Sequence, residues 1–187
     1  MKRLFVAVPI QEKSRREIIN AIITDPTVKR MPVRWTAVQN LHLTLQFLGD
    51  VEERKIPEIK AILNKFEFSG FPGSLCFTRL GAFPDHDAPR VLWLGIKENK
   101  NLGIIQHDLT SALSGMGFNT DGKKFKPHLT LGRVRENVRF GTDNYVYLEQ
   151  LVSAAVVSDS PLDRITLFES VLRPCGPIYS VIYEKKL

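Results

Sequence analysis

The chain has 187 residues, of which 43% are hydrophobic and 25% are charged. This length suits one domain with a sizeable core, and this composition excludes disordered, collagen-like and fibrous proteins. The formal net charge of +6 favours an anionic partner such as nucleic acid, although charge alone identifies none.

The first residues combine a basic pair, Lys2 and Arg3, with a short apolar run that ends at Pro9. A secretory signal needs an apolar region of roughly 7–15 residues, so a first β-strand over 4–8 is the better interpretation. No stretch of about 18 apolar residues occurs, so the sequence predicts no membrane span. We therefore expect a cytoplasmic protein that does not associate with membranes.

Strand and helix signals alternate along the rest of the chain. A capping box at Ser14 and Glu17, followed by isoleucines, predicts a helix over 14–24. Further helices are expected at about 53–66 and 100–115. Strands are expected at about 41–48, 74–80, 90–96, from 128 onward, 152–158, 164–172 and 178–184, with a hairpin turn at 174–177. The sequence therefore predicts an α+β fold with mostly antiparallel strands.

The two cysteines, Cys76 and Cys175, are far apart in the sequence. Two cysteines without close spacing form neither a disulfide framework nor a zinc knuckle. We expect both to be ordinary buried or half-buried thiols.

The tetrapeptide His-Leu-Thr-Leu occurs twice, at 42–45 and at 128–131. Each copy belongs to a half of the chain that contains strands and helices, which suggests two similar lobes that each present one copy. Alternation along the first strand places His42 and Thr44 on one face, with Gln46 beyond them, and directs the leucines and Phe47 toward a core.

In the second copy, His128 and Thr130 share a face in the same way. Basic residues surround this copy in the sequence: Lys123, Lys124, Lys126, Arg133, Arg135 and Arg139. Without the neighbouring motif, such a run is typical of a solvated loop.

Two histidines across one phosphate could divide the work of opening a cyclic phosphodiester. One neutral imidazole would deprotonate water, and one protonated imidazole would protonate the leaving oxygen. The hydroxyls of Thr44 and Thr130 could hydrogen-bond the non-bridging oxygens or orient the rings.

Zinc binding is an alternative use of the paired imidazoles, but neither copy has a carboxylate or cysteine beside it. A second cluster, Asp85-His86-Asp87, is a weaker candidate for ligands. His107 falls within a predicted helix and is expected to be a partly exposed helix residue. The sequence thus indicates neither a metal nor a cofactor.

The paired motifs resemble those of the two-histidine phosphoesterase superfamily. Within it, the chain is most similar to the RNA 2′,3′-cyclic phosphodiesterases, first described as 2′-5′ RNA ligases. The similarity covers nearly the whole chain and is weakest over about 136–160. It is carried by the stretches 3–8, 40–49, 90–95, 126–133, 167–170 and 176–179.

This resemblance implies a single domain over 1–187 with two lobes, and an active-site cleft between two antiparallel sheets related by a pseudo-twofold axis. It implies hydrolysis of 2′,3′-cyclic phosphates, at RNA ends or in small nucleotides, to 2′-phosphomonoesters without metal. His42 would be the proton donor and His128 the proton acceptor, assisted by Thr44 and Thr130. We expect a monomer.

The resemblance also implies that Arg133 contacts phosphate. Strict alternation would place this side chain on the face opposite His128, unless a bulge at Gly132 turns it inward. For Arg90 and Trp93, a structural role and a substrate contact remain equally open. Two other functions remain open for the whole protein, namely 2′-5′ RNA ligation by the reverse reaction and RNA or nucleotide binding without catalysis.

Overall fold

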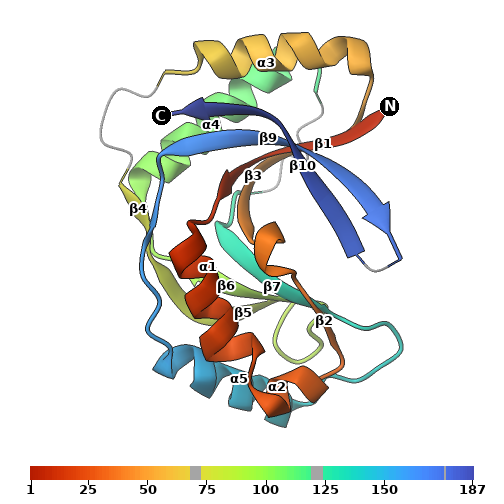
Figure 1. Cartoon of the computed structure of the whole chain (residues 1–187), viewed down its shortest axis with the longest axis vertical. Helices are drawn as coiled ribbons and strands as arrows, with labels where there is room; N and C mark the ends of the chain where they lie inside the picture. Colours follow the sequence, from red (N-terminus) through yellow and green to blue (C-terminus); the bar gives the residue numbers. More distant parts are fainter. Residues whose placement is uncertain (68–72, 119–123, 175) are drawn as a thin grey trace.

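An antiparallel sheet of eight strands runs through the molecule in the computed structural model, which describes residues 1–67, 73–118, 124–174 and 176–187 (Figure 1). Its strands lie in the order β10-β9-β1-β3-β7-β6-β5, and β2 pairs with β7. These strands are β1 Lys2–Pro9, β2 Val33–Trp35, β3 His42–Val51, β5 Phe77–Phe83, β6 Val91–Ile96, β7 His128–Val134, β9 Arg164–Arg173 and β10 Gly176–Lys186. A small second sheet pairs β4 Ser74–Leu75 with β8 Ser160–Pro161. The α+β fold predicted from the sequence is confirmed.

Helices α3 and α4 lie at one end of the molecule and α2 and α5 at the other, with α1 between them (Figure 1). Helices α3 and α4 cover the half of the sheet that contains β1, β3, β9 and β10, whereas α1, α2 and α5 lie beside the other half. The helices are α1 Glu12–Ile18, α2 Pro26–Arg30, α3 Ile56–Lys65, α4 Lys100–Ser114 and α5 Thr142–Ala154. A π-helical turn, Ile19–Ile23, continues α1, and two 3₁₀ turns cover Val38–Asn40 and Glu53–Lys55. None of the helices in the described ranges has the length and apolar character needed to cross a membrane.

Helix α4 illustrates how the sequence specifies these elements. The side chain of Asn99 accepts a hydrogen bond from the Leu102 N–H at 3.1 Å, which caps the first turn. Leucines and isoleucine at helical spacing form its buried face: Leu102, Ile105, Leu109 and Leu113. The exposed face carries His107, as predicted.

The predicted capping box at the first helix is wrong. Helix α1 begins earlier, at Glu12, and Ser14 is fully buried within it. The Ser14 hydroxyl donates to the carbonyl of Asp159 at 3.3 Å, and Glu17 accepts from the Ser158 N–H at 2.6 Å. Both residues therefore fasten a distant segment to the helix instead of capping it.

The strand predicted at 152–158 is also wrong, because helix α5 reaches Ala154 and no strand follows until β8. Three valines in this stretch, Val152, Val156 and Val157, favour a strand in a short window. The longer window shows a helical period, since Leu148 and Val152 are buried four residues apart.

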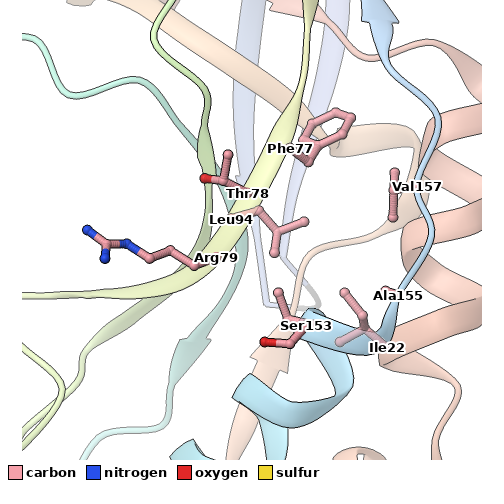
Figure 2. A pocket seen from close by; sticks show the side chains of 9 residues that line it. Ile22, Phe77, Thr78, Arg79, Leu94, Ser153, Ala155 and Val157 are labelled. Carbon is pink, nitrogen blue, oxygen red and sulfur yellow. The ribbon is translucent and has the colours of Figure 1, made fainter.

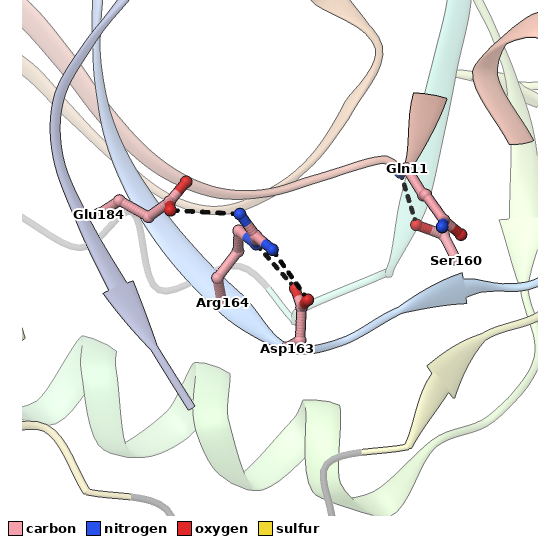
Figure 3. Close-up of polar contacts among 5 residues, drawn as sticks. All are labelled: Gln11, Ser160, Asp163, Arg164 and Glu184. Carbon is pink, nitrogen blue, oxygen red and sulfur yellow. Dashed lines mark hydrogen bonds and ion pairs between the residues drawn. The ribbon is translucent and has the colours of Figure 1, made fainter. Parts of the chain in front are cut away.

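Polar contacts fix the ends of the C-terminal strands (Figure 3). The guanidinium of Arg164 donates to Asp163 at 2.9 and 3.0 Å and to Glu184 on β10 at 3.2 Å. Nearby, the backbone N–H of Gln11 donates to the Ser160 hydroxyl at 2.8 Å. The segment that leads into β9 is thereby tied to the end of β1. Of the two cysteines, Cys76 is a half-buried free thiol, as predicted, and Cys175 lies outside the described residues.

Candidate active site

The two halves of the sheet meet where β3 and β7 pair, at Leu43 opposite Leu129. Both leucines are fully buried on the core side. In an antiparallel ladder of this register, the flanking positions face each other at about 5 Å between Cβ atoms. His42 thus lies across from Thr130, and Thr44 lies across from His128, all on one face. The pairing of Leu43 with Leu129 therefore brings the two His-Leu-Thr-Leu motifs side by side in the sheet.

The His42 ring is fixed by two hydrogen bonds. Its Nδ1 lies 2.6 Å from the carbonyl of Asn40, and its Nε2 lies 3.0 Å from the Thr44 hydroxyl. A carbonyl only accepts, so Nδ1 carries a proton and Nε2 of the neutral ring accepts from Thr44. The Asn40 side chain in turn donates to the carbonyl of Pro177 at 2.8 Å, which anchors this turn to the β9–β10 hairpin.

The pKa of His42 is lowered to about 4, against an ordinary value of 6.5. Burial is the main cause, because the imidazolium loses hydration, and the positive charge of His128 adds repulsion. The hydrogen bond to Asn40 opposes this shift.

His128 has a matching arrangement. Its Nδ1 donates to the carbonyl of Lys126 at 2.7 Å, again two residues earlier in the chain. The ring contacts Phe83 edge-on at 5.0 Å and Trp93 at 5.9 Å between centroids. The pKa of His128 is lowered, chiefly by burial and also by the charges of Lys126 and Arg133. Trp93 is buried and packs against His128, so it supports the ring.

Lys126 also places its ammonium over the Trp93 ring, 4.6 Å from the centroid. This cation–π contact holds a positive charge beside the site. Of the other basic residues noted in the sequence near His128, Lys123 lies outside the described residues.

Each motif strand contains a β-bulge at its second leucine. In β3, Thr44 pairs with Ala7 and Gln46 pairs with Val6, so Leu45 is the extra residue. A bulge of one residue reverses the alternation beyond it. The expected orientations of Gln46 and Phe47 are therefore wrong. Gln46 points to the core side, where it accepts from Thr110 of α4 at 3.0 Å, and Phe47 lies on the histidine face.

In β7, Thr130 pairs with Trp93 and Gly132 pairs with Leu92, so Leu131 is the extra residue. The bulge expected near Gly132 brings Arg133 to the His128 face, where its charge acts on the His128 ring. Glycine is required at 132, because a Cβ there would lie 2.6 Å from the Val33 side chain and 3.0 Å from the Arg34 carbonyl oxygen of β2.

A cluster of aromatic rings, centred on Phe5, supports the His42 side of the site. The Phe5 ring lies 4.9 Å from His42, 6.0 Å from Phe47, 5.3 Å from Phe168 and 5.0 Å from Tyr179. Sequence reasoning missed this cluster, because its members come from four strands. Pairing of Phe5 with both Phe47 and Phe168 puts all three on one face.

The described residues contain no group of three or more histidine, cysteine, aspartate or glutamate side chains that could hold a metal ion. His86 lies in an exposed bend beside Asp87, 3.4 Å away. A cavity of about 360 Å³ lies elsewhere, between β5 and the end of α5, and its lining includes Ile22, Arg79 and Val157 (Figure 2). Neither motif histidine lines it.

The sequence model of the family described as LigT like Phosphoesterase matches residues 9–93 and again 94–179, so the chain belongs to this family. Each match contains one His-Leu-Thr-Leu motif.

Several relatives are named RNA 2′,3′-cyclic phosphodiesterase. One from Thermotoga maritima is 35% identical over 184 residues, covering 97% of this chain and 94% of the relative. One from Archaeoglobus fulgidus is 35% identical and covers 95% of this chain and 96% of the relative. Among solved structures, a Thermus thermophilus protein has a TM-score of 0.74 at 25% identity, covering 99% of this chain and 97% of that one. E. coli LigT complexed with 3′-AMP shares the fold, with a TM-score of 0.71 at 23% identity, covering 100% of this chain and 98% of that one.

Proposed function

We propose that this protein is an RNA 2′,3′-cyclic phosphodiesterase, which hydrolyses the cyclic phosphate to a 2′-phosphomonoester. The relatives that match over nearly their whole length carry this name. The single observation that carries the proposal is the matched pair of imidazoles. Each ring donates Nδ1–H to the carbonyl two residues earlier, and both rings share one face of the sheet.

In the proposed reaction, the Nε2 of His128 removes a proton from water as the water oxygen attacks phosphorus. The bond from phosphorus to the 3′ oxygen breaks, and His42 gives its Nε2 proton to that oxygen. The product has a 2′-phosphate and a 3′-hydroxyl, and the two rings return to their starting protonation states by exchanging protons with solvent. No metal is needed, because the two rings supply both the acid and the base.

The negative charge of the bound substrate would favour the protonated form of His42, which is the form that acts as the acid. In the free protein His42 is neutral at pH 7, because its pKa is about 4. A bound phosphodiester anion favours the imidazolium and raises this pKa. Thr44, Thr130 and Arg133 would hold the non-bridging oxygens, since hydroxyls donate one hydrogen bond and guanidinium groups pair with phosphate.

The chain would act as one unit in which each half supplies one His-Leu-Thr-Leu motif. The substrates would be RNA ends with a 2′,3′-cyclic phosphate, or small cyclic nucleotides, met in the cytoplasm by a monomer. The net charge of +6 supports an anionic substrate.

The first test measures turnover of a 2′,3′-cyclic nucleotide in excess chelator. His42→Gln and His128→Gln should each lower kcat by about 10²-fold or more. His107→Gln, on the exposed face of α4, is the matched control. Parental turnover in a folded His42→Gln or His128→Gln variant would refute the proposal.

The division of labour has its own test, with a substrate whose 3′ bridging oxygen is replaced by sulfur. A thiolate leaves without protonation, so His42→Gln should recover most of the parental rate on this substrate, whereas His128→Gln should not. Recovery by His128→Gln instead would exchange the two roles.

A further inference from the structure

Strand β2 adds a second arginine to the face of the sheet that carries the histidines. This short strand lies along the last residues of β7 (Figure 1), where Arg34 pairs with Arg133 and Val33 pairs with Val134. Both valines are buried on the core side, and both arginines are exposed. Residues directly opposite each other in an antiparallel pair share a face, so Arg34 lies beside Arg133 on the histidine face.

The fold does not need two positive charges at opposite positions. Side chains placed in this way have Cβ atoms about 5 Å apart, and like charges at this separation destabilise a sheet. An exposed arginine elsewhere, Arg54, pairs with the Glu52 carboxylate at 2.6 Å. In the part of the chain that the structure describes, no carboxylate forms an ion pair with Arg34 or Arg133. The pair therefore concentrates uncompensated positive charge on one face, which suits an anionic ligand.

The arginine pair lies next to the reacting centre and not within it. Along β7, Arg133 and its partner Arg34 follow Thr130 by three residues, which is about 7–10 Å in a bulged strand. Arg133 belongs to the strand of His128, and its charge acts on the His128 ring. Arg34 belongs to the neighbouring strand, which carries no motif. If Arg133 holds the reacting phosphate, Arg34 remains available for a second anionic group beside the first.

We propose that Arg34 binds the phosphodiester that joins the last two nucleotides of an RNA ending in a 2′,3′-cyclic phosphate, and so favours RNA chains over single cyclic nucleotides. This inference rests on the proposed function, in which the substrate is either an RNA end or a small nucleotide. In such an RNA, the next negative charge after the cyclic phosphate is this phosphodiester. A guanidinium binds phosphate through paired N–H groups and reads no base, so the preference concerns chain length and not base sequence.

The test compares adenosine 2′,3′-cyclic phosphate with an adenylate hexamer that ends in the same cyclic phosphate. The quantity is kcat/KM for the hexamer divided by kcat/KM for the nucleotide. Arg34→Gln should lower this ratio by about 10-fold, because a hydrogen bond to a charged group contributes about this much to binding. Arg34→Lys should retain part of the parental preference, since the positive charge remains.

Arg54→Gln is the matched control, because it removes the same charge from a side chain that is 79% exposed, in the 3₁₀ turn before α3. It should leave the ratio unchanged. An unchanged ratio in Arg34→Gln would overturn the proposal, whether both substrates keep their parental values or both lose equally. An equal loss would mean that Arg34 acts on the reacting phosphate.

The salt dependence of binding separates this inference from the proposed function. The probe is an adenylate hexamer that ends in a 2′-phosphate, and the quantity is the slope of log Kd against the logarithm of the salt concentration. Each phosphate contact on a single strand contributes about 0.7 to this slope, so Arg34→Gln should reduce it by about 0.7, whereas Arg54→Gln should keep the parental slope. Parental protein that turned over neither substrate would refute the proposed function alone. An unchanged slope in Arg34→Gln would refute the phosphodiester contact whether or not turnover is seen.

Discussion

Replacing His42 with glutamine should remove part of the acid sensitivity of the folded protein. The pKa of His42 is about 4 in the folded chain and 6.5 when the ring is solvated, as in the unfolded chain. As the pH falls from 6.5, the unfolded chain therefore binds a proton that the folded chain resists. The free energy of unfolding decreases through this window and levels off below pH 4.

The magnitude follows from the size of the shift. Each pKa unit corresponds to 1.36 kcal/mol, so the difference between 6.5 and about 4 amounts to at most about 3 kcal/mol. Glutamine does not titrate, so its variant should lack this contribution. The parent should lose up to about 3 kcal/mol more than the variant between pH 7 and pH 4.

Urea unfolding at half-unit pH steps from 7.5 to 3.5 measures this difference. Carboxylates also titrate in this range, but they contribute equally to both proteins and cancel in the comparison. His107→Gln is the control and should follow the parent, because His107 is exposed on α4. Parallel curves for the parent and His42→Gln would refute the inference that burial keeps His42 neutral.

Three further perturbations probe the supports of the site. Gly132→Ala should destabilise the fold by about 2 kcal/mol in urea unfolding, because the new Cβ meets β2, whereas Gly103→Ala, at an exposed position of α4 with open space, should not. Asn40→Ala should lower the free energy of unfolding by about 1–3 kcal/mol and reduce kcat, since the anchor to the hairpin is lost; unchanged values would show that the anchor is dispensable. Lys126→Met should raise the pKa of His128 in an NMR titration of its ring, because the Lys126 charge lowers this pKa in the parent; a lower or unchanged pKa would contradict this.

The repeated motif made the centre of the site predictable from the sequence. His42, Thr44, His128 and Thr130 share one face because each pair spans two residues of a strand, within which alternation holds. Nothing in the sequence around Leu45 marks a bulge, so the orientations of Gln46 and Phe47 could not be predicted. Near Leu131, by contrast, Gly132 did signal an irregularity.

The remaining errors share a physical origin. Ser14 and Glu17 have the residue types of a capping box, but their partners at 158–159 are more than 140 residues away. The aromatic cluster around Phe5 likewise needs four strands to assemble. Local sequence patterns predicted most helices and strands well. Contacts between segments far apart in the sequence decided the roles of individual side chains, and these contacts cannot be read from a local pattern.

The backbone carbonyl two residues before each motif histidine accepts a hydrogen bond from the Nδ1–H of the ring and so fixes its tautomer. The packing around each ring, by contrast, includes side chains from the other half of the chain. Tyr179 contacts the His42 ring, and Phe83 and Trp93 contact the His128 ring. The two halves are therefore interlocked at the site, and a separated half would lose this packing around its own imidazole.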